Sequence, residues 1–136
     1  MSRTGTALSA EGLRFVTERH LATLTTLRAD GTPHVTPVGF TWDAGANLAR
    51  VICDAASRKA VHAAATGSVA LCQVDGRRWL SVEGTGTVRS DAAAVAEAVA
   101  RYAARYRQPR ENPTRVVIEI AVRRLLGSNQ LIVQRR

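Results

Sequence analysis

Apolar residues in this chain stand in short runs that alternate with polar residues, and turn-forming residues separate one run from the next. Residues 21–28 (Leu-Ala-Thr-Leu-Thr-Thr-Leu-Arg) are rich in β-branched side chains, which favour strands. Five further runs of this kind cover residues 34–42, 48–53, 69–74, 79–88 and 115–125. The pattern therefore predicts six strands, and the tail at residues 127–136 can add a short seventh.

The turns between these runs indicate how the strands pair. Asp30-Gly31 and Asp75-Gly76 tolerate the positive φ angles of tight hairpins, so we expect a largely antiparallel sheet. Pro37 stands inside the second run, and because proline cannot donate to a strand ladder it marks an edge or a bulge. Six short strands in one domain need closure to avoid exposed edges, which favours a small barrel with helices at its openings.

Three segments have helical patterns. Residues 10–19 follow a possible cap at Ser9, residues 58–65 follow Ser57 and precede Gly67, and residues 91–106 follow a cap at Ser90. The 136 residues suit one domain, 1–136, whose first eight residues we expect to be flexible. No apolar stretch reaches the length of a membrane span and no secretory signal is visible, so we expect a cytoplasmic protein with no membrane partner.

The formal net charge of +8 points to an anionic partner. Nucleic acid is disfavoured, because the basic residues form no long run and only 4% of residues are aromatic and able to stack on bases. An anionic small molecule fits better. Lys59 is the only lysine among 19 basic residues. The bias towards Arg and Ala otherwise suggests a GC-rich genome, as in actinobacteria.

The sequence contains no motif for chemistry by side chains alone. It lacks a Gly-x-Gly-x-x-Gly fingerprint, a Walker loop and a Gly-x-Ser-x-Gly elbow. Cys53 and Cys72 stand in apolar runs, so we expect two buried thiols, and the three scattered histidines give no metal site. If the protein is an enzyme, a bound cofactor carries the reaction.

The segment Ser57-Arg58-Lys59 is the clearest candidate binding site. It begins a helix directly after a strand, so free backbone N–H groups, a hydroxyl and two cations come together. This combination suits a phosphate group. The alternative is an ordinary serine cap followed by two solvated bases, and spacing alone does not separate the two.

Several longer stretches resemble the pyridoxamine-phosphate-oxidase-like family of split β-barrels, and in particular its branch that uses coenzyme F420, a deazaflavin. The resemblance covers about residues 9–128. The matching stretches are Arg19-His-Leu-Ala-Thr-Leu-Thr-Thr-Leu-Arg-Ala-Asp30, Pro33-His-Val35, Val38-Gly-Phe-Thr41, Ala49-Arg-Val-Ile52, Ser57-x-Lys59-Ala-Val61, Gln73-Val-Asp-Gly76, Arg78-Trp-Leu-Ser81, Glu83-Gly84 and Arg115-Val-Val-Ile-Glu119. It implies a mainly β (α+β) fold, a six- to seven-stranded largely antiparallel split barrel of the FMN-binding type with flanking helices.

The resemblance also implies which residues meet the cofactor. Backbone of the second strand meets the ring edge and ribityl chain, the end of the third strand lies below the ring, and the start of the second helix clamps the phosphate. A tryptophan reaches the cofactor across a dimer interface. In this sequence these residues are Val35, Thr36, Pro37, Val38, Gly39, Phe40, Ile52, Cys53, Ser57, Arg58, Lys59 and Trp79. Glu83 and Gly84 are expected to have a structural role, at a point in a strand where another part of the backbone approaches closely.

The implied activity is an F420H2-dependent reduction of a conjugated acceptor, with biliverdin to bilirubin as the reaction. The oxidase members of the family carry Arg and Lys where this chain has Val35 and Phe40, which disfavours vitamin-phosphate oxidation and weakens the case for FMN. An FMN-binding oxidoreductase and a non-catalytic cofactor or tetrapyrrole carrier remain as alternatives. We expect a homodimer, with Arg28, Arg50 and Arg78 as candidates for binding an anionic tetrapyrrole.

Overall fold

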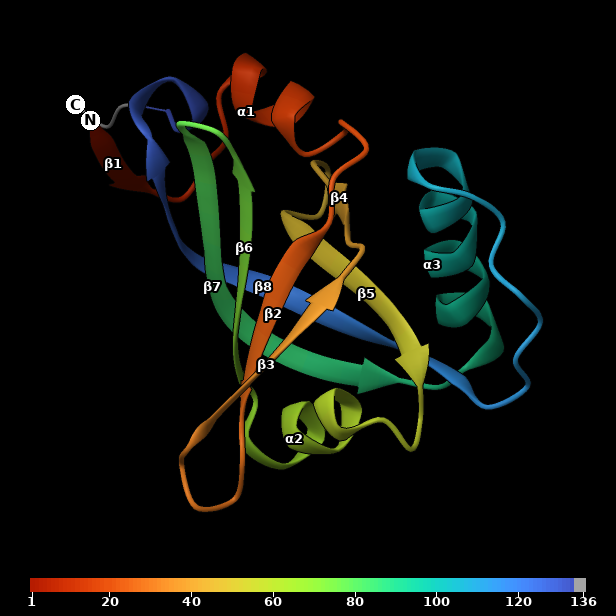
Figure 1. The fold of residues 1–136 in the computed structure, drawn as a ribbon. Coiled ribbons are helices and arrows are strands. Elements are labelled where there is room, and N and C mark those ends of the chain that lie inside the picture. Colours follow the sequence, from red (N-terminus) through yellow and green to blue (C-terminus); the bar gives the residue numbers. More distant parts are fainter. Residues whose placement is uncertain (134–136) are drawn as a thin grey trace.

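The computed structural model describes residues 1–133, and these form one sheet of eight strands flanked by helices (Figure 1). The strands pair in the order β3-β2-β6-β7-β8-β5-β4, and β1 pairs with β8 off this path. The strands are β1 Ser2–Gly5, β2 Ala22–Leu27, β3 Pro33–Val38, β4 Thr41–Asp43, β5 Leu48–Asp54, β6 Ser68–Asp75, β7 Arg78–Arg89 and β8 Arg115–Ser128. The helices are α1 Ala10–Phe15, α2 Arg58–Thr66, α3 Ala92–Arg105 and the 3-10 turn η1 Asn129–Leu131.

The predicted fold class is confirmed. All recorded strand pairs are antiparallel. The turns at Gly31 and Gly76 have φ angles of +85° and +61°, as their Asp-Gly sequences predict. Within residues 1–133 no pairing joins β3 to β4 at the two ends of the path, so the barrel is split. Pro37 lies in β3, an end strand, which confirms the predicted edge position.

The run predicted as one strand over residues 34–42 forms two. β3 ends at Val38, which pairs with Ala22 of β2, whereas β4 begins at Thr41, which pairs with Arg50 of β5. The chain changes partner here because Phe40 turns into the core, where it is only 1% exposed. Together with β1, this break raises the strand count above the predicted six to seven.

The two ends of the described chain also differ from expectation. Residues 1–8 were expected to be flexible, yet Ser2–Gly5 pair with β8. The predicted extra strand at 127–136 does not form over its described part, because β8 continues to Ser128 and η1 follows. The remainder of that prediction lies outside the described residues.

The three helices form where the sequence predicts them, with one end and one cap to correct. α1 ends at Phe15, four residues before the expected end at Arg19. The cap of α3 is Asp91 and not Ser90, because the Asp91 carboxylate accepts a bond from the backbone N–H of Ala94 (3.2 Å). α2 ends as predicted at Gly67, which has a φ angle of +76°. No described helix is long and apolar enough to cross a membrane.

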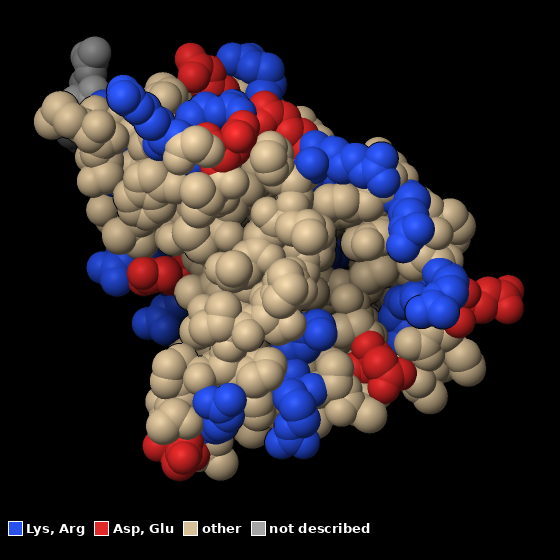
Figure 2. Space-filling model, in the orientation of Figure 1, with Lys and Arg blue, Asp and Glu red and all other residues tan. Residues whose placement is uncertain are grey.

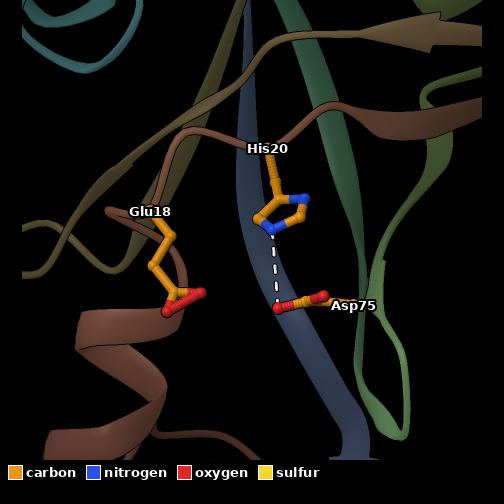
Figure 3. A group of neighbouring side chains, drawn as sticks. All are labelled: Glu18, His20 and Asp75. Atoms are coloured by element: carbon orange, nitrogen blue, oxygen red, sulfur yellow. Dashed lines mark ion pairs between the residues drawn. The ribbon is translucent and has the colours of Figure 1, made fainter.

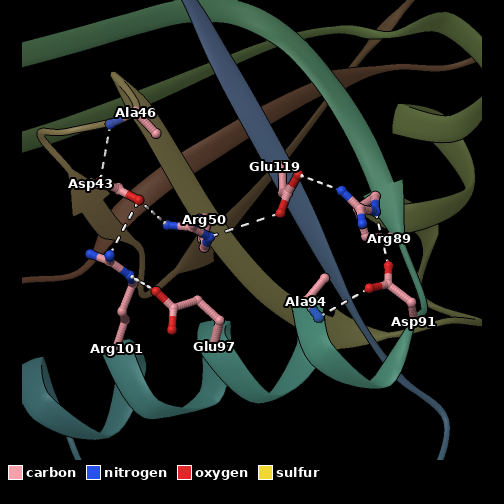
Figure 4. Close-up of polar contacts among 9 residues, drawn as sticks. All are labelled: Asp43, Ala46, Arg50, Arg89, Asp91, Ala94, Glu97, Arg101 and Glu119. Carbon is pink, nitrogen blue, oxygen red and sulfur yellow. Dashed lines mark hydrogen bonds and ion pairs between the residues drawn. The ribbon is translucent and has the colours of Figure 1, made fainter.

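Ion pairs fix α3 against the sheet (Figure 4). Asp43 of β4 binds both Arg50 of β5 (2.9 Å) and Arg101 of α3 (3.2 Å). Arg50 also lies 3.9 Å from Glu119 of β8. The hydrogen bond from Arg50 is the main reason that the pKa of Asp43 is lowered. α3 therefore has a defined position beside β5, which matters for the site below.

Candidate functional site

A hollow of about 480 Å³ lies where the ends of β3 and β5 meet the start of α2, the end of α3 and the loop after α3. This volume is within the range of sites for small molecules and cofactors. The hollow is lined by Pro37, Val38, Gly39, Ile52, Cys53, Asp54, Lys59, Tyr102, Arg107, Gln108, Pro109, Arg110, Asn112 and Arg115.

The start of α2, whose Lys59 lines this hollow, has backbone N–H donors that neither a capping side chain nor a helix bond uses. The Ser57 hydroxyl makes no capping bond to the helix and instead donates to the Asp54 carbonyl (2.7 Å). The Val61 N–H donates to the Ser57 carbonyl (3.1 Å), so the N–H groups of Arg58 and Lys59 precede the helix bonds and point out of the helix end. Burial raises the pKa of the neighbouring Cys53 thiol, so this cysteine is a neutral wall and not a thiolate nucleophile.

Asp54 fastens the loop after α3 to the end of β5. Its carboxylate accepts hydrogen bonds from the Thr114 hydroxyl, the Asn112 amide (3.2 Å) and the Ala56 backbone N–H (2.9 Å). These bonds, that of Thr114 foremost, lower the pKa of Asp54. The only carboxylate in the lining is therefore engaged by the protein itself.

The remaining charge in the hollow is positive. Lys59, Arg107, Arg110 and Arg115 line it, and no described carboxylate lies within ion-pair distance of any of them. Figure 2 shows blue side chains gathered along the side of the molecule that carries α3 and the following loop. The arrangement suits a ligand with a phosphate and further carboxylates.

The structure brings together half of the residues that the sequence proposed for cofactor binding. Those that line the hollow are Pro37, Val38, Gly39, Ile52, Cys53 and Lys59. The others do not line it: Val35 is exposed and Thr36 half-buried further back along β3, the Phe40 ring is in the core, and Ser57 and Arg58 stand beside Lys59. Trp79 lies in a different hollow beside Ser2 and Ser128. Cys53 and Cys72 were expected to be buried, and both are only partly buried.

Sequence reasoning missed the part of the site contributed by α3 and the loop after it. Tyr102, Arg107, Arg110 and Arg115 line the hollow, and none was proposed. The available signal was a proline-bounded loop, residues 107–113, with two arginines and no hydrophobic periodicity. Only the three-dimensional position of α3 shows that this loop faces the start of α2.

Two of the arginines proposed for an anionic substrate are engaged elsewhere. Arg50 is paired with Asp43, and Arg78 binds Glu18 through both terminal nitrogens (3.2 and 2.9 Å). Arg28 donates to the Pro33 carbonyl (2.6 Å) at the β2–β3 turn. None of the three lines the hollow. Paired cations meet a new anion only by losing their present partner, so Arg50 and Arg78 are poor substrate sites.

Glu18, His20 and Asp75 form the one described group with the spacing of a metal site (Figure 3). His20 Nε2 lies 3.5 Å from Asp75, but Arg78 binds both carboxylates. The Arg78 guanidinium therefore already occupies both carboxylates that a metal ion would need.

A larger hollow of about 610 Å³ lies on β2, β6, β7 and β8. It contains none of the proposed site residues, and its Glu83 and Arg124 pair with each other (2.8 Å).

Comparison with known proteins agrees with the fold. The pyridoxamine 5'-phosphate oxidase family model matches residues 8–129. An F420H(2)-dependent biliverdin reductase of Mycobacterium tuberculosis (strain CDC 1551 / Oshkosh) is 56% identical over 132 residues, 97% of this chain and 96% of the relative. A solved F420 reductase has a TM-score of 0.68 at 25% identity, covering 82% of this chain and 93% of its own. A conserved hypothetical protein from Mycobacterium tuberculosis reaches 0.75 at 25% identity, covering 86% and 81%.

Proposed function

The chain belongs to the pyridoxamine 5'-phosphate oxidase family, and from that premise we propose that it is an F420H2-dependent reductase that converts biliverdin to bilirubin. The observation that carries the proposal is the cationic hollow between β3, β5, α2 and the loop after α3. Its free charges match an anionic deazaflavin. The extensive identity to a biliverdin reductase supplies the substrate.

The residues of the hollow fit such a cofactor at its charged end. Lys59 and the free N–H groups at the start of α2 suit the phosphate. Arg107, Arg110 and Arg115 suit the carboxylates of a glutamate tail, because guanidinium groups bind carboxylates in a bidentate manner. FMN has a phosphate but no such tail, so it would leave these arginines unused.

The uncharged wall of the hollow suits the ring. Val38, Gly39 and Ile52 present backbone and short side chains, and Cys53 is neutral, so a flat ring can approach closely. When bound, the reduced deazaflavin supplies the hydride. The contribution of the chain is to orient the ring, hold the acceptor over it at reacting distance and exclude water. Val35, Thr36 and Phe40 act in this proposal through the backbone of β3 and its end, and Ser57 and Arg58 by shaping the start of α2.

Trp79 enters the proposal only through a second copy of the chain. It lies beside Ser128, whose hydroxyl accepts a bond from the backbone N–H of Trp79 (3.1 Å), and it lines a different hollow from Lys59. We therefore propose a homodimer in which Trp79 of one chain covers the ring in the other. A monomer by light scattering at micromolar concentration would contradict this arrangement.

We also propose that the protein acts in the cytoplasm.

Parallel titrations test the function. The purified protein is titrated with FMN, oxidised F420 and F420H2, and the reduction of biliverdin by F420H2 is followed by absorbance. We expect tight binding of the deazaflavin, weaker binding of FMN and formation of bilirubin. Binding of F420 without turnover would indicate a carrier, and tighter binding of FMN would indicate a flavin enzyme of the same fold.

A further inference from the structure

The break between β3 and β4 leaves backbone polar groups outside the sheet. Val38 is the last residue of β3 paired to β2, and Thr41 is the first of β4 paired to β5, so Phe40 lies outside both ladders. Buried backbone groups without partners are costly, and they are satisfied here by side chains of α3. Phe40 N–H donates to the Tyr106 hydroxyl (3.2 Å), and its carbonyl accepts from Arg105 Nη1 (2.5 Å).

The two side chains from the end of α3 are themselves held from several directions. The Arg105 guanidinium lies 4.6 Å from the Phe40 ring centroid and 5.0 Å from that of Tyr106, so it stacks on both rings. Their other contacts are bonds from Tyr106 Oη to the His20 carbonyl (2.6 Å), from Arg105 Nε to the Glu18 carbonyl (2.9 Å) and from Arg105 Nη2 to Gln73 Oε1 (2.8 Å). The network ties the break to β6 and to the segment before β2.

The segment held in this way is also a wall of the hollow. Val38 and Gly39 line it, and a Cβ atom added to Gly39 would stand 3.0 Å from ring carbons of both Tyr102 and Tyr106. The end of α3 thus lies directly behind the wall. The same helix end leads into the loop that carries Arg107 and Arg110.

We propose that Arg105 and Tyr106 are positioning residues that preform the Val38–Phe40 backbone as the surface on which the cofactor ring rests. This inference rests on the proposed function and assigns part of the binding geometry to residues that do not themselves line the hollow. A wall already fixed before binding needs no ordering when the ring arrives, so the affinity is higher than for a loose segment.

Tyr106→Phe tests the proposal, because it removes the hydroxyl and keeps the ring. In the cofactor-free variant, amide hydrogen exchange at Phe40 should become faster, since its acceptor is lost. The Kd for F420 should rise roughly tenfold, the effect of one hydrogen bond on a binding constant. Arg105→Lys keeps the charge but cannot make all three guanidinium bonds, to the Glu18 and Phe40 carbonyls and to Gln73. It should also speed exchange at Phe40 and raise the Kd for F420.

Ser9→Ala is the matched control. The Ser9 hydroxyl also bridges two segments, accepting from Gly12 N–H (3.1 Å) and donating to the Gln130 carbonyl (2.5 Å), but it lies at α1 and η1, away from the hollow. This variant should melt at a lower temperature with an unchanged Kd. Unchanged exchange at Phe40 in Tyr106→Phe, or faster exchange with an unchanged Kd, would overturn the proposal. If the wild type binds FMN and no deazaflavin, only the proposed function fails, and the Kd comparison is made with FMN.

Discussion

At the scale of single residues, the candidate site depends on which cations are free. Lys59 and Arg58 are neighbours on α2, yet Lys59 lines the hollow and Arg58 is exposed outside its lining. Arg50 and Arg78 are paired with carboxylates, whereas Arg107 and Arg110 have none within the described chain. The ability of each cation to bind a ligand therefore follows from its neighbours and not from its type.

Replacing Lys59 with Ala should weaken cofactor binding by about 1–3 kcal/mol, because one charge-assisted contact to the phosphate is lost. Folding should be retained, since this side chain contributes little to the core. Calorimetric titration with F420 measures the change. Arg58→Ala should weaken binding less, and Arg14→Ala on α1 controls for net charge alone. Equal Kd values for Lys59→Ala and the wild type would refute the role of Lys59.

At the scale of elements, local sequence signals predicted most of what the structure contains. The Asp-Gly hairpins, the β-branched runs and the Ser57 and Gly67 ends of α2 are short-range patterns, and they were confirmed. The break at Gly39–Phe40 depends on Phe40 entering the core and on Arg105 and Tyr106 from α3. Such long-range contacts leave no local pattern, which explains why one strand was predicted in place of two.

The pairing of β7 with β8 depends on the absence of a side chain at Gly84. β7 has an irregular register between Glu83 and Gly84, and a Cβ atom at Gly84 would stand 2.2 Å from the Ala121 carbonyl oxygen of β8. This confirms the predicted close approach. Gly84→Ala should therefore lower the free energy of unfolding by about 2–4 kcal/mol through backbone displacement. Urea denaturation checks this, and Gly45→Ala, which meets its nearest atom at an ordinary 3.5 Å, should be close to neutral.

The ion pairs under α3 give the protein a predictable response to acid. The pKa of Asp43 is lowered below its ordinary 3.8, mainly by the Arg50 hydrogen bond, so its ionised form stabilises the fold above that pH. This stabilisation is lost as the pH falls through the lowered pKa. Asp43→Asn should reduce the free energy of unfolding by about 1–3 kcal/mol at pH 7, with a smaller difference in strong acid.

Urea denaturation at several pH values measures this difference. Glu111→Gln is the control, because Glu111 is exposed and has no described ion pair. If the difference in free energy of unfolding between Asp43→Asn and the wild type stays constant down to strong acid, ionisation of Asp43 does not contribute to stability.

At the scale of the whole molecule, the net charge of +8 is consistent with the anionic ligand of the proposed function. Composition alone predicted an anionic small molecule, and six of the twelve residues that the resemblance named line one hollow. The location of the free arginines was not predictable. It depends on the packing of α3, which brings a loop distant in sequence next to α2.

A salt titration tests the role of this charge. Each exposed contact between an arginine and a tail carboxylate contributes only about 0–1 kcal/mol, but several act together and are screened by salt. The preference for F420 over FMN should therefore be largest at low salt and shrink towards molar salt. Calorimetry with both cofactors across that range measures it. A preference that does not change with salt would contradict binding of the tail along arginines.

The single lysine has a practical consequence. Reagents that acylate primary amines have one side-chain target in the entire sequence, Lys59, and it lines the hollow. Mass spectrometry of the protein after brief acylation can therefore read occupancy of the hollow at one residue, with the cofactor-free protein as the reference. Bound cofactor should slow the acylation of Lys59 relative to that reference. The protein thus carries its own footprinting probe, which needs no engineered label.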